Sequence, residues 1–341
     1  MMAGIDIHKR VLQSAVLDTE SGEFLEDRLA GREGLVHWAM RWRGRVSTVV
    51  IEATTGWRWV ARELTAAGFV VRLVDPGQAK ALRGKKRKAK TDRLDARWLC
   101  LLAARELLAE CEAWLAPAEI QELRDRTRLR KALADDRTRW AQRLHALLTQ
   151  EGWPCERARL LTAAGRQWVQ ALALPPAARA HAELLLRLIQ QLEAETETLE
   201  AELRRFAKSD PRCQRLTTIF GVGPIIACHL LAEIGEASRF HRARQVVRLA
   251  GLDPVVAESA DNKRRGKLAK AGPPALRWAL VQAAQHAGRE RSPDRAHYRK
   301  TSRRCGTQRA KLTIARTIAH RAYHLLHELE QQQEQEQPVA A

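Results

Sequence analysis

The stretch Ser47-Thr48-Val49-Val50-Ile51-Glu52-Ala53-Thr54-Thr55-Gly56 determines the fold class that we expect for the first third of the chain. Its β-branched run predicts a short strand, and the threonines and glycine that follow predict a turn. Residues Trp57 to Ala67 then fit a helix that stops at Gly68, and Phe69 to Val74 fit another strand. Strands that alternate with helices predict an α/β domain.

The flanking segments continue this pattern. Gly4 to Ile7 and Val11 to Leu17 are typical of an opening pair of strands, with Glu23 to Leu29 as a third candidate. Further along the chain, Thr91 is a good N-cap for a helix that we expect to run to about Leu108. We therefore expect an α/β domain over residues 1–112.

The middle of the chain lacks strand signals. From Pro117 to about Phe206, apolar residues recur at helical or heptad steps. This spacing predicts two long antiparallel helices over residues 113–208, with a helical excursion at Pro154 to Pro176, as a spacer or a dimerisation hairpin. Residues 209–327 are expected to form a second, mainly helical unit, and the Gln- and Glu-rich residues 328–341 a disordered tail.

Composition indicates a polyanionic partner. The chain has 341 residues, 45% of them hydrophobic, which is enough for real cores, and its formal net charge is +19. Nucleic acid is the simplest partner for such a charge, and an acidic membrane surface is the competitor. No apolar run approaches the ~18 residues of a membrane span, and the N-terminus lacks the shape of a signal peptide, so we expect a cytoplasmic protein. The six cysteines form no C-x-x-C pair, which argues against a disulfide framework and a zinc module.

Four acids at the ends of predicted elements form a candidate metal site. Asp6 lies in the first strand, Glu52 closes a later one, and Asp92 and Asp95 share the first turn of a helix, where a spacing of three puts them on one face. In a ribonuclease-H-like sheet, acids placed in this way hold two Mg²⁺ ions about 3.5–4 Å apart. Oxygen ligands of this kind suit Mg²⁺, and the sequence has no histidine or cysteine cluster that would indicate zinc.

The same acids could instead have purely structural roles, without a metal ion. Acids in the first turn of a helix oppose the positive end of its dipole, and Glu52 could cap the turn after its strand. Asp6 is harder to explain in this way, because an unpaired charge between apolar neighbours in a buried strand is costly.

Several segments, among them a basic stretch from Arg289 to Arg304, are candidates for contact with a nucleic-acid backbone. Directly before Asp92 lies the most basic run of the chain, Arg83 to Lys90. The glycines of Gly221-Val222-Gly223 resemble a helix-hairpin-helix, in which backbone amides approach a phosphate, although a glycine turn between packed helices is an equal alternative. A later polar loop adds more cations. The residues expected to contact nucleic acid are Lys85, Lys86, Arg87, Lys88, Lys90, Gly221, Gly223, Lys263, Arg264, Arg265, Lys267 and Lys270.

Ser259 opens that polar loop and is a candidate nucleophile. A serine in a polar loop is usually only solvated, and a serine hydroxyl needs a base or a metal for activation. No histidine lies nearby in the sequence, so any activation has to come from elsewhere in the fold.

Taken together, three blocks resemble the transposases of the insertion sequence 110 family: Gly4 to Lys9, Ile51 to Gly56 and Lys90 to Ala96. A C-terminal block from Gly251 to Arg277 matches the spacing of the family's serine-containing motif. Two positions depart from it, with Ala260 in place of a glycine and Ala269 in place of a serine.

The resemblance implies a RuvC-like Asp-Glu-Asp-Asp domain, a coiled-coil region and a transposase domain. Asp6, Glu52, Asp92 and Asp95 would bind Mg²⁺, as two ions in the family's manner, and Ser259 would form a covalent phosphoserine link to DNA. The resemblance also implies donor and target DNA, a structured noncoding bridge RNA that pairs with both, and a homo-oligomer that is dimeric or tetrameric. Such a protein would act in the prokaryotic cytoplasm, at the nucleoid. Two alternatives remain: a metal-dependent, structure-selective nuclease that uses water, and a non-catalytic nucleic-acid-binding protein.

Overall fold

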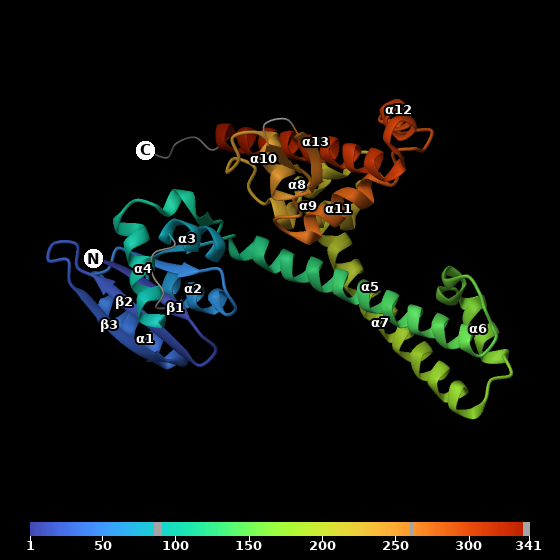
Figure 1. The fold of residues 1–341 in the computed structure, drawn as a ribbon, viewed down its shortest axis with the longest axis horizontal. Helices are drawn as coiled ribbons and strands as arrows, with labels where there is room; N and C mark the ends of the chain where they lie inside the picture. Colours follow the sequence, from blue (N-terminus) through green and yellow to red (C-terminus); the bar gives the residue numbers. More distant parts are fainter. Residues whose placement is uncertain (85–90, 260–261, 337–341) are drawn as a thin grey trace. The chain divides into compact units, whose positions relative to one another are not determined.

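The computed structural model describes residues 1–84, 91–259 and 262–336, with the backbone alone for 255–259 and 262–267. The chain divides into two compact units, Met1–Leu115 and Ala116–Ala341. Each unit has its own elements and its own hydrophobic core, and Figure 1 shows the course of the chain through them.

The first unit is built on a mixed six-stranded sheet with the order β3-β2-β1-β4-β5-β6. The strands β1, β2 and β3 pair antiparallel in sequence, whereas β4 lies parallel to both β1 and β5. The expected opening pair and third strand are therefore confirmed. The strands are β1 Met2–Ile7, β2 Val11–Leu17, β3 Phe24–Ala30, β4 Thr48–Glu52, β5 Val70–Val74 and β6 Glu112–Ala113.

Helices cover both faces of this sheet, so its central strands are apolar on both sides. Ile5 and Ile51 belong to the core that contains residues of α1 and α2, whereas Val50 packs with Leu99 of α4 on the other face. The helical elements are α1 Gly31–Trp42, α2 Trp57–Ala66, α3 Pro76–Arg83, α4 Asp92–Ala104 and the 3₁₀ turn η1 Leu108–Glu110. The sequence interpretation had placed no helix at α1 or α3.

Helix α4 begins and ends for local reasons. The Thr91 hydroxyl accepts a hydrogen bond from the Leu94 amide at 3.3 Å, as predicted for an N-cap. The helix ends at Ala104, four residues before the predicted end, and Glu106 then takes a positive φ of 57°. A non-glycine residue in that region is incompatible with a continuing right-handed helix.

The second unit contains two long helices, α5 and α7, that pack side by side (Figure 1). Arg137 binds Glu193 at 2.9 Å across the pair, and a small core at one end encloses Leu148, Leu160 and Leu185. The predicted pair of helices and the helical excursion between them are thus present. These elements are α5 Ala118–Gln150, η2 Arg157–Leu161, α6 Ala163–Ala171 and α7 Pro176–Ser209.

The rest of the second unit is mainly helical, as expected. Helices α8 and α9 flank a tight glycine turn in which Gly221 has a φ of 89°. A Cβ on Gly221 would lie 2.4 Å from the Ala283 carbonyl oxygen, so packing against α11 also requires glycine there. The remaining helices are α8 Pro211–Thr217, α9 Pro224–Ile234, α10 Ala243–Leu249, α11 Pro274–Ala284, α12 Arg295–Cys305 and α13 Thr307–Glu336.

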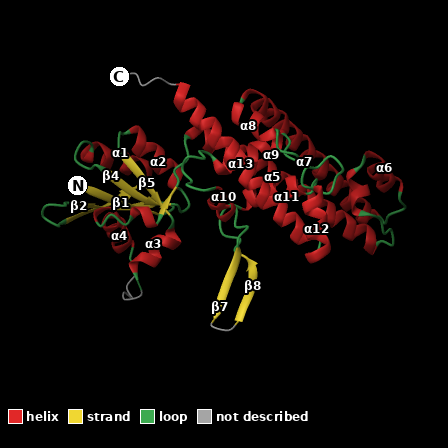
Figure 2. Ribbon diagram, turned by 90° about the horizontal axis from the view of Figure 1, so that it is seen from above, coloured by secondary structure: helices red, strands yellow, loops and turns green. Residues whose placement is uncertain are grey.

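The segment interpreted from sequence as a polar loop is a two-stranded antiparallel hairpin. Its strands are β7 Pro254–Ser259 and β8 Asn262–Leu268, and Figure 2 shows them extending away from the helices of their own unit. The charged residues concealed the strand signal, because they interrupt the apolar alternation that marks a strand with one buried face.

The expected disordered tail is wrong for residues 328–336. Helix α13 continues to Glu336, and the Glu330 carboxylate accepts hydrogen bonds from the amides of Ala237 and Ser238 at 2.6 and 2.7 Å. Glu and Gln are good helix formers, so their abundance does not by itself end a helix. Residues 337–341 lie outside the described residues. Within the described part of the chain, no helix combines the length and the apolar character of a membrane span.

Candidate metal centre

The register of the sheet places Asp6 and Glu52 at one edge. Ile5 pairs with Ile51 in the parallel β1–β4 ladder, so the next residue of each strand lies at the same level. Side chains alternate along a strand, and Gly4 and Val50 face α4. Asp6 and Glu52, two residues further on, therefore lie on the face that α4 covers.

Gly4 allows α4 to approach this edge closely. A Cβ at position 4 would lie 2.3 Å from the Ala96 carbonyl oxygen and 2.6 Å from the Leu99 Cβ, so no other residue fits under the helix. Arg93 and Arg97 of α4 also pair with Glu26 of β3. Burial raises the pKa of Glu26, but the hydrogen bonds from these arginines outweigh burial, and its pKa is lowered. The first turn of α4 is thereby held beside the end of β1.

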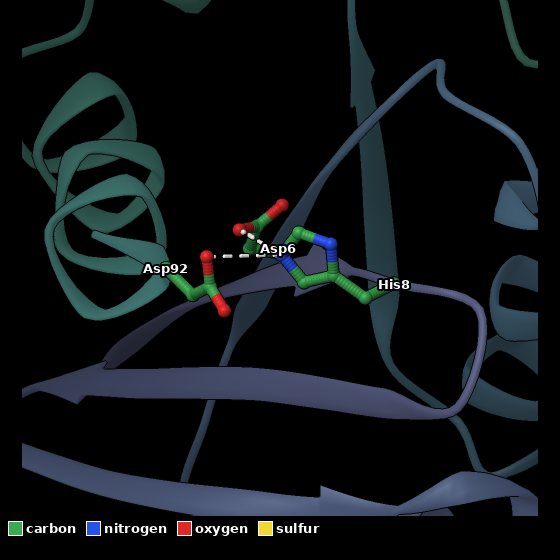
Figure 3. Close-up of side chains that lie close together, drawn as sticks. All are labelled: Asp6, His8 and Asp92. Carbon is green, nitrogen blue, oxygen red and sulfur yellow. Dashed lines mark hydrogen bonds and ion pairs between the residues drawn. The ribbon is translucent and has the colours of Figure 1, made fainter. Parts of the chain in front are cut away.

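Three side chains converge where β1 ends and α4 begins (Figure 3). The His8 Nε2 atom lies 3.1 Å from Oδ2 of Asp6 and 3.2 Å from Oδ1 of Asp92. One ligand atom from each of the three residues lies within 4.8 Å of the others, the arrangement of a candidate metal site. Asp6 is almost completely buried, whereas the His8 and Asp92 side chains are 50% and 64% exposed.

The electrostatics at Asp6 are unfavourable for an anion. Burial raises the pKa of the Asp6 carboxyl, the neighbouring His8 lowers it, and the negative charges of Asp95 and Asp92 raise it, with a net upward shift. The nearly buried Asp6 carboxyl thus has two further carboxylates, those of Asp92 and Asp95, as neighbours.

Asp95 and Glu52 stand outside this group of three. Asp95 pairs with Arg83, whose second guanidinium nitrogen donates to the Leu94 carbonyl at 3.0 Å. Glu52 is half-buried at the end of β4 and has interactions of its own. The structure therefore brings Asp6 and Asp92 together directly, and it places Asp95 near enough to raise the pKa of Asp6.

The sequence interpretation missed His8. A spacing of two residues puts Asp6 and His8 on the same side of an extended chain, and this is the only signal that could have identified it. A cavity of about 340 Å³ opens beside the imidazole, lined by His8, Lys9, Arg10, Val11, Gln13, Arg28 and Asp92.

Apart from Gly221 and Gly223 in the turn between α8 and α9, the other predicted site residues fall in three places. Lys85 to Lys88 and Lys90 lie outside the described residues, as does Ala260. Ser259 is the last residue of β7, and its backbone pairs with Asn262 at the end of the hairpin. Lys263, Arg264, Arg265 and Lys267 lie on β8, and Lys270 follows it with a positive φ of 52°.

The residues at the end of β1 fit a divalent cation. Hard carboxylate oxygens are the usual ligands of Mg²⁺, and the N-terminal turn of α4 holds two of them. A cation there would offset the burial and the carboxylate repulsion that raise the pKa of Asp6. Asp6 and Asp92 are the residues that would hold it directly.

Two family models match this chain. Residues 3–152 match the Asp-Glu-Asp-Asp (DEDD) transposase model named for IS110, and residues 213–299 match the model described as the transposase IS116/IS110/IS902 family. Together they span both units.

Three curated proteins are among the relatives. A probable family 20 transposase of Pseudomonas aeruginosa is 31% identical over 242 residues, which cover 70% of this chain and 70% of that protein. The putative transposase y4rJ of Sinorhizobium fredii is 32% identical over 70% of this chain and 65% of its own length. The transposase for insertion sequence element IS1111A of Coxiella burnetii is 26% identical over 83% of this chain and 76% of that protein.

Proposed function

This chain belongs to the IS110 family of transposases, and from that premise we propose that it cleaves and exchanges DNA strands with a divalent metal ion and a serine nucleophile. The observation that carries the proposal is the convergence of Asp6, His8 and Asp92 within 4.8 Å at the start of α4. The matched DEDD model covers these three residues.

The first unit holds the metal. Asp6 and Asp92 bind it, and Asp95 and Glu52 complete the four-acid set of a RuvC-like sheet. A bound Mg²⁺ would neutralise charge that develops on the phosphodiester oxygens. Arg83 holds Asp95 in place through its ion pair.

The second unit supplies the nucleophile. The Ser259 hydroxyl loses its proton as its oxygen bonds to phosphorus, and the phosphorus–oxygen bond to one deoxyribose breaks. The displaced deoxyribose oxygen takes up a proton and leaves as a hydroxyl, so that the DNA remains joined to Ser259 as a phosphodiester. Reversal of this step with a different hydroxyl rejoins the strands.

The basic segments bind the nucleic-acid partners. The β8 cations and the run Lys85 to Lys90 contact backbone phosphates of donor and target DNA and of a structured guide RNA. The α8–turn–α9 element acts as a helix-hairpin-helix, and α5 with α7 forms the coiled-coil dimerisation hairpin of a dimer or tetramer.

Substitution of Ser259 tests the nucleophile. We expect Ser259→Ala to abolish the covalent protein–DNA adduct, measured as a slower-migrating band of labelled junction DNA on a denaturing gel. Ser21→Ala, in an exposed loop of the first unit, is the matched control and keeps the adduct. If Ser259→Ala still cleaves DNA in the presence of Mg²⁺, the protein is a water-dependent nuclease.

Substitution of the acids tests the metal centre separately. Asp6→Asn and Asp95→Asn are expected to reduce Mg²⁺-dependent cleavage at least 100-fold, because each removes a charge from the cation site. Unchanged cleavage in both variants would contradict the proposed metal site, and a complete lack of cleavage by the unsubstituted protein would favour a non-catalytic binding protein.

Extraction of nucleic acid from the purified protein tests the guide. We expect one discrete, structured RNA species, identified by sequencing. Recovery of random fragments alone would contradict guidance by RNA and leave the DNA-cleavage proposal standing.

A further inference from the structure

His8 occupies a position in the metal centre that the four-acid scheme does not use. Ile7, between Asp6 and His8, packs into the core that contains residues of α1 and α2. Asp6 lies on the opposite face, and His8, the first residue after β1, turns to the same side, so that both side chains meet Asp92 in the first turn of α4.

The two distances from the His8 nitrogen to the carboxylate oxygens fit a six-coordinate ion. A metal ion with bonds of about 2.1 Å in octahedral geometry has neighbouring ligand atoms about 3.0 Å apart. The His8 Nε2 atom lies 3.1 Å from the Asp6 oxygen and 3.2 Å from the Asp92 oxygen, close to that length for both pairs.

The open side of the group suits the substrate. The His8 and Asp92 side chains are half or more exposed, so the described residues leave part of the space around their ligand atoms open. The adjoining cavity of about 340 Å³ is lined by Lys9, Arg10 and Arg28, three cations that would bind the phosphate of a substrate. Coordination positions left open toward such a cavity are typical of catalytic metal sites.

We propose that the Nε2 atom of His8 is a direct ligand of the divalent ion at Asp6 and Asp92, which makes this a mixed nitrogen–oxygen site that favours Mn²⁺ over Mg²⁺. The inference rests on the metal site of the proposed function and deepens it. Imidazole nitrogen binds transition ions better than it binds Mg²⁺, whereas carboxylates alone discriminate little.

The competing role for His8 is that of a hydrogen-bonded counter-ion. An imidazole that only hydrogen-bonds to the two carboxylates has the same nitrogen–oxygen distances. The two roles differ in one observable property, which is whether a nitrogen atom binds the ion.

Pulsed electron paramagnetic resonance of Mn²⁺ bound to the full-length protein tests this directly. We expect an imidazole ¹⁴N coupling in the unsubstituted protein that disappears in His8→Gln. The control His37→Gln, at an exposed position of α1, keeps the coupling. Bound Mn²⁺ without a nitrogen coupling in the unsubstituted protein overturns the inference.

Competition between the two ions gives a second measurement. We expect the ratio of Mn²⁺ to Mg²⁺ affinity, measured by titration calorimetry, to fall about tenfold in His8→Gln and to stay unchanged in His37→Gln. An unchanged ratio in His8→Gln contradicts the inference.

Asp6→Asn separates failure of this inference from failure of the proposed function. If Asp6→Asn removes Mn²⁺ binding while the nitrogen coupling is absent throughout, the metal site stands and His8 is not a ligand. If Asp6→Asn leaves Mn²⁺ binding and DNA cleavage unchanged, the metal site itself is misplaced.

Discussion

Asp6 is a strand residue whose carboxyl belongs to the candidate metal site, and its surroundings make the charged form unfavourable. It is nearly buried, it neighbours two further carboxylates, and its pKa is raised chiefly by burial. A carboxyl with a raised pKa in the folded state binds protons that the unfolded state has already released. Its contribution to the free energy of unfolding therefore falls as pH rises from the ordinary aspartate pKa of 3.8 through its folded pKa.

This sign leads to a prediction about pH. In metal-free protein, we expect Asp6→Asn to gain stability relative to the unsubstituted protein as pH rises from about 4 to 7, because the amide has no proton to lose. Urea unfolding at several pH values measures the difference. Asp18→Asn, at a loop position, is the control. A gain that is absent, or that goes the other way, would contradict the burial of an unfavourable charge at Asp6.

His8 could not be assigned to the site from residue types alone. The sequence pattern drew attention to acids because carboxylates are the expected ligands of Mg²⁺. Whether His8 turns toward them depended on the end of β1 and on the placement of α4, and a spacing of two residues alone does not settle that.

Among the secondary-structure elements, the contact of α4 with β1 holds the residues of the candidate metal centre together. Gly4 allows this close contact, because a Cβ there would collide with the backbone at Ala96 and the side chain of Leu99. The helix carries Asp92 and Asp95 to the sheet edge only if it sits this close.

We therefore predict that Gly4→Ala weakens both stability and metal binding. Overpacking of this kind costs about 1–3 kcal/mol, and a displaced α4 moves Asp92 away from Asp6. Thermal unfolding and Mn²⁺ titration measure the two effects. If a destabilised Gly4→Ala variant kept full Mn²⁺ affinity, metal binding would not depend on the close approach of α4 to β1.

The two glycines of the turn between α8 and α9 differ in structure. The sequence left open whether this turn contacts phosphate or only joins two packed helices. Gly221 has a positive φ and packs against Ala283, whereas Gly223 has a φ of −86° and no atom within 4 Å of an added Cβ. We predict that Gly221→Ala lowers the free energy of unfolding by about 2 kcal/mol and that Gly223→Ala changes it by less than about 0.5 kcal/mol. Urea unfolding of both variants measures this, and equal effects would contradict the structural role of Gly221.

For the molecule as a whole, we expect the net charge of +19 to dominate binding to polyanions. We predict that affinity for non-specific duplex DNA falls about 10³-fold or more between 50 and 200 mM salt, as for a protein that neutralises about 6–10 phosphates. Fluorescence anisotropy of a labelled duplex measures the slope. Affinity that does not depend on salt would exclude the basic segments as the main DNA contacts.

Local sequence patterns predicted most of the central strands and the two long helices, but not α1, α3 or the β7–β8 hairpin. The alternation of β-branched runs with glycine stops identified the α/β unit, and the heptad spacing identified α5 and α7. The acidic blocks also identified the family, because they carry their chemistry in short local motifs. These features depend on residues that are close together in the sequence, so sequence patterns are enough to predict them.

Tertiary structure alone decided which of these residues meet. The β1–β4 register put Asp6 level with Glu52, the approach at Gly4 carried Asp92 to the end of β1, and His8 turned toward both acids. The ordered end of α13 likewise depends on a contact between Glu330 and the amides of Ala237 and Ser238, 92 or more positions earlier. Such contacts join residues far apart in the chain, and local propensity carries no information about them.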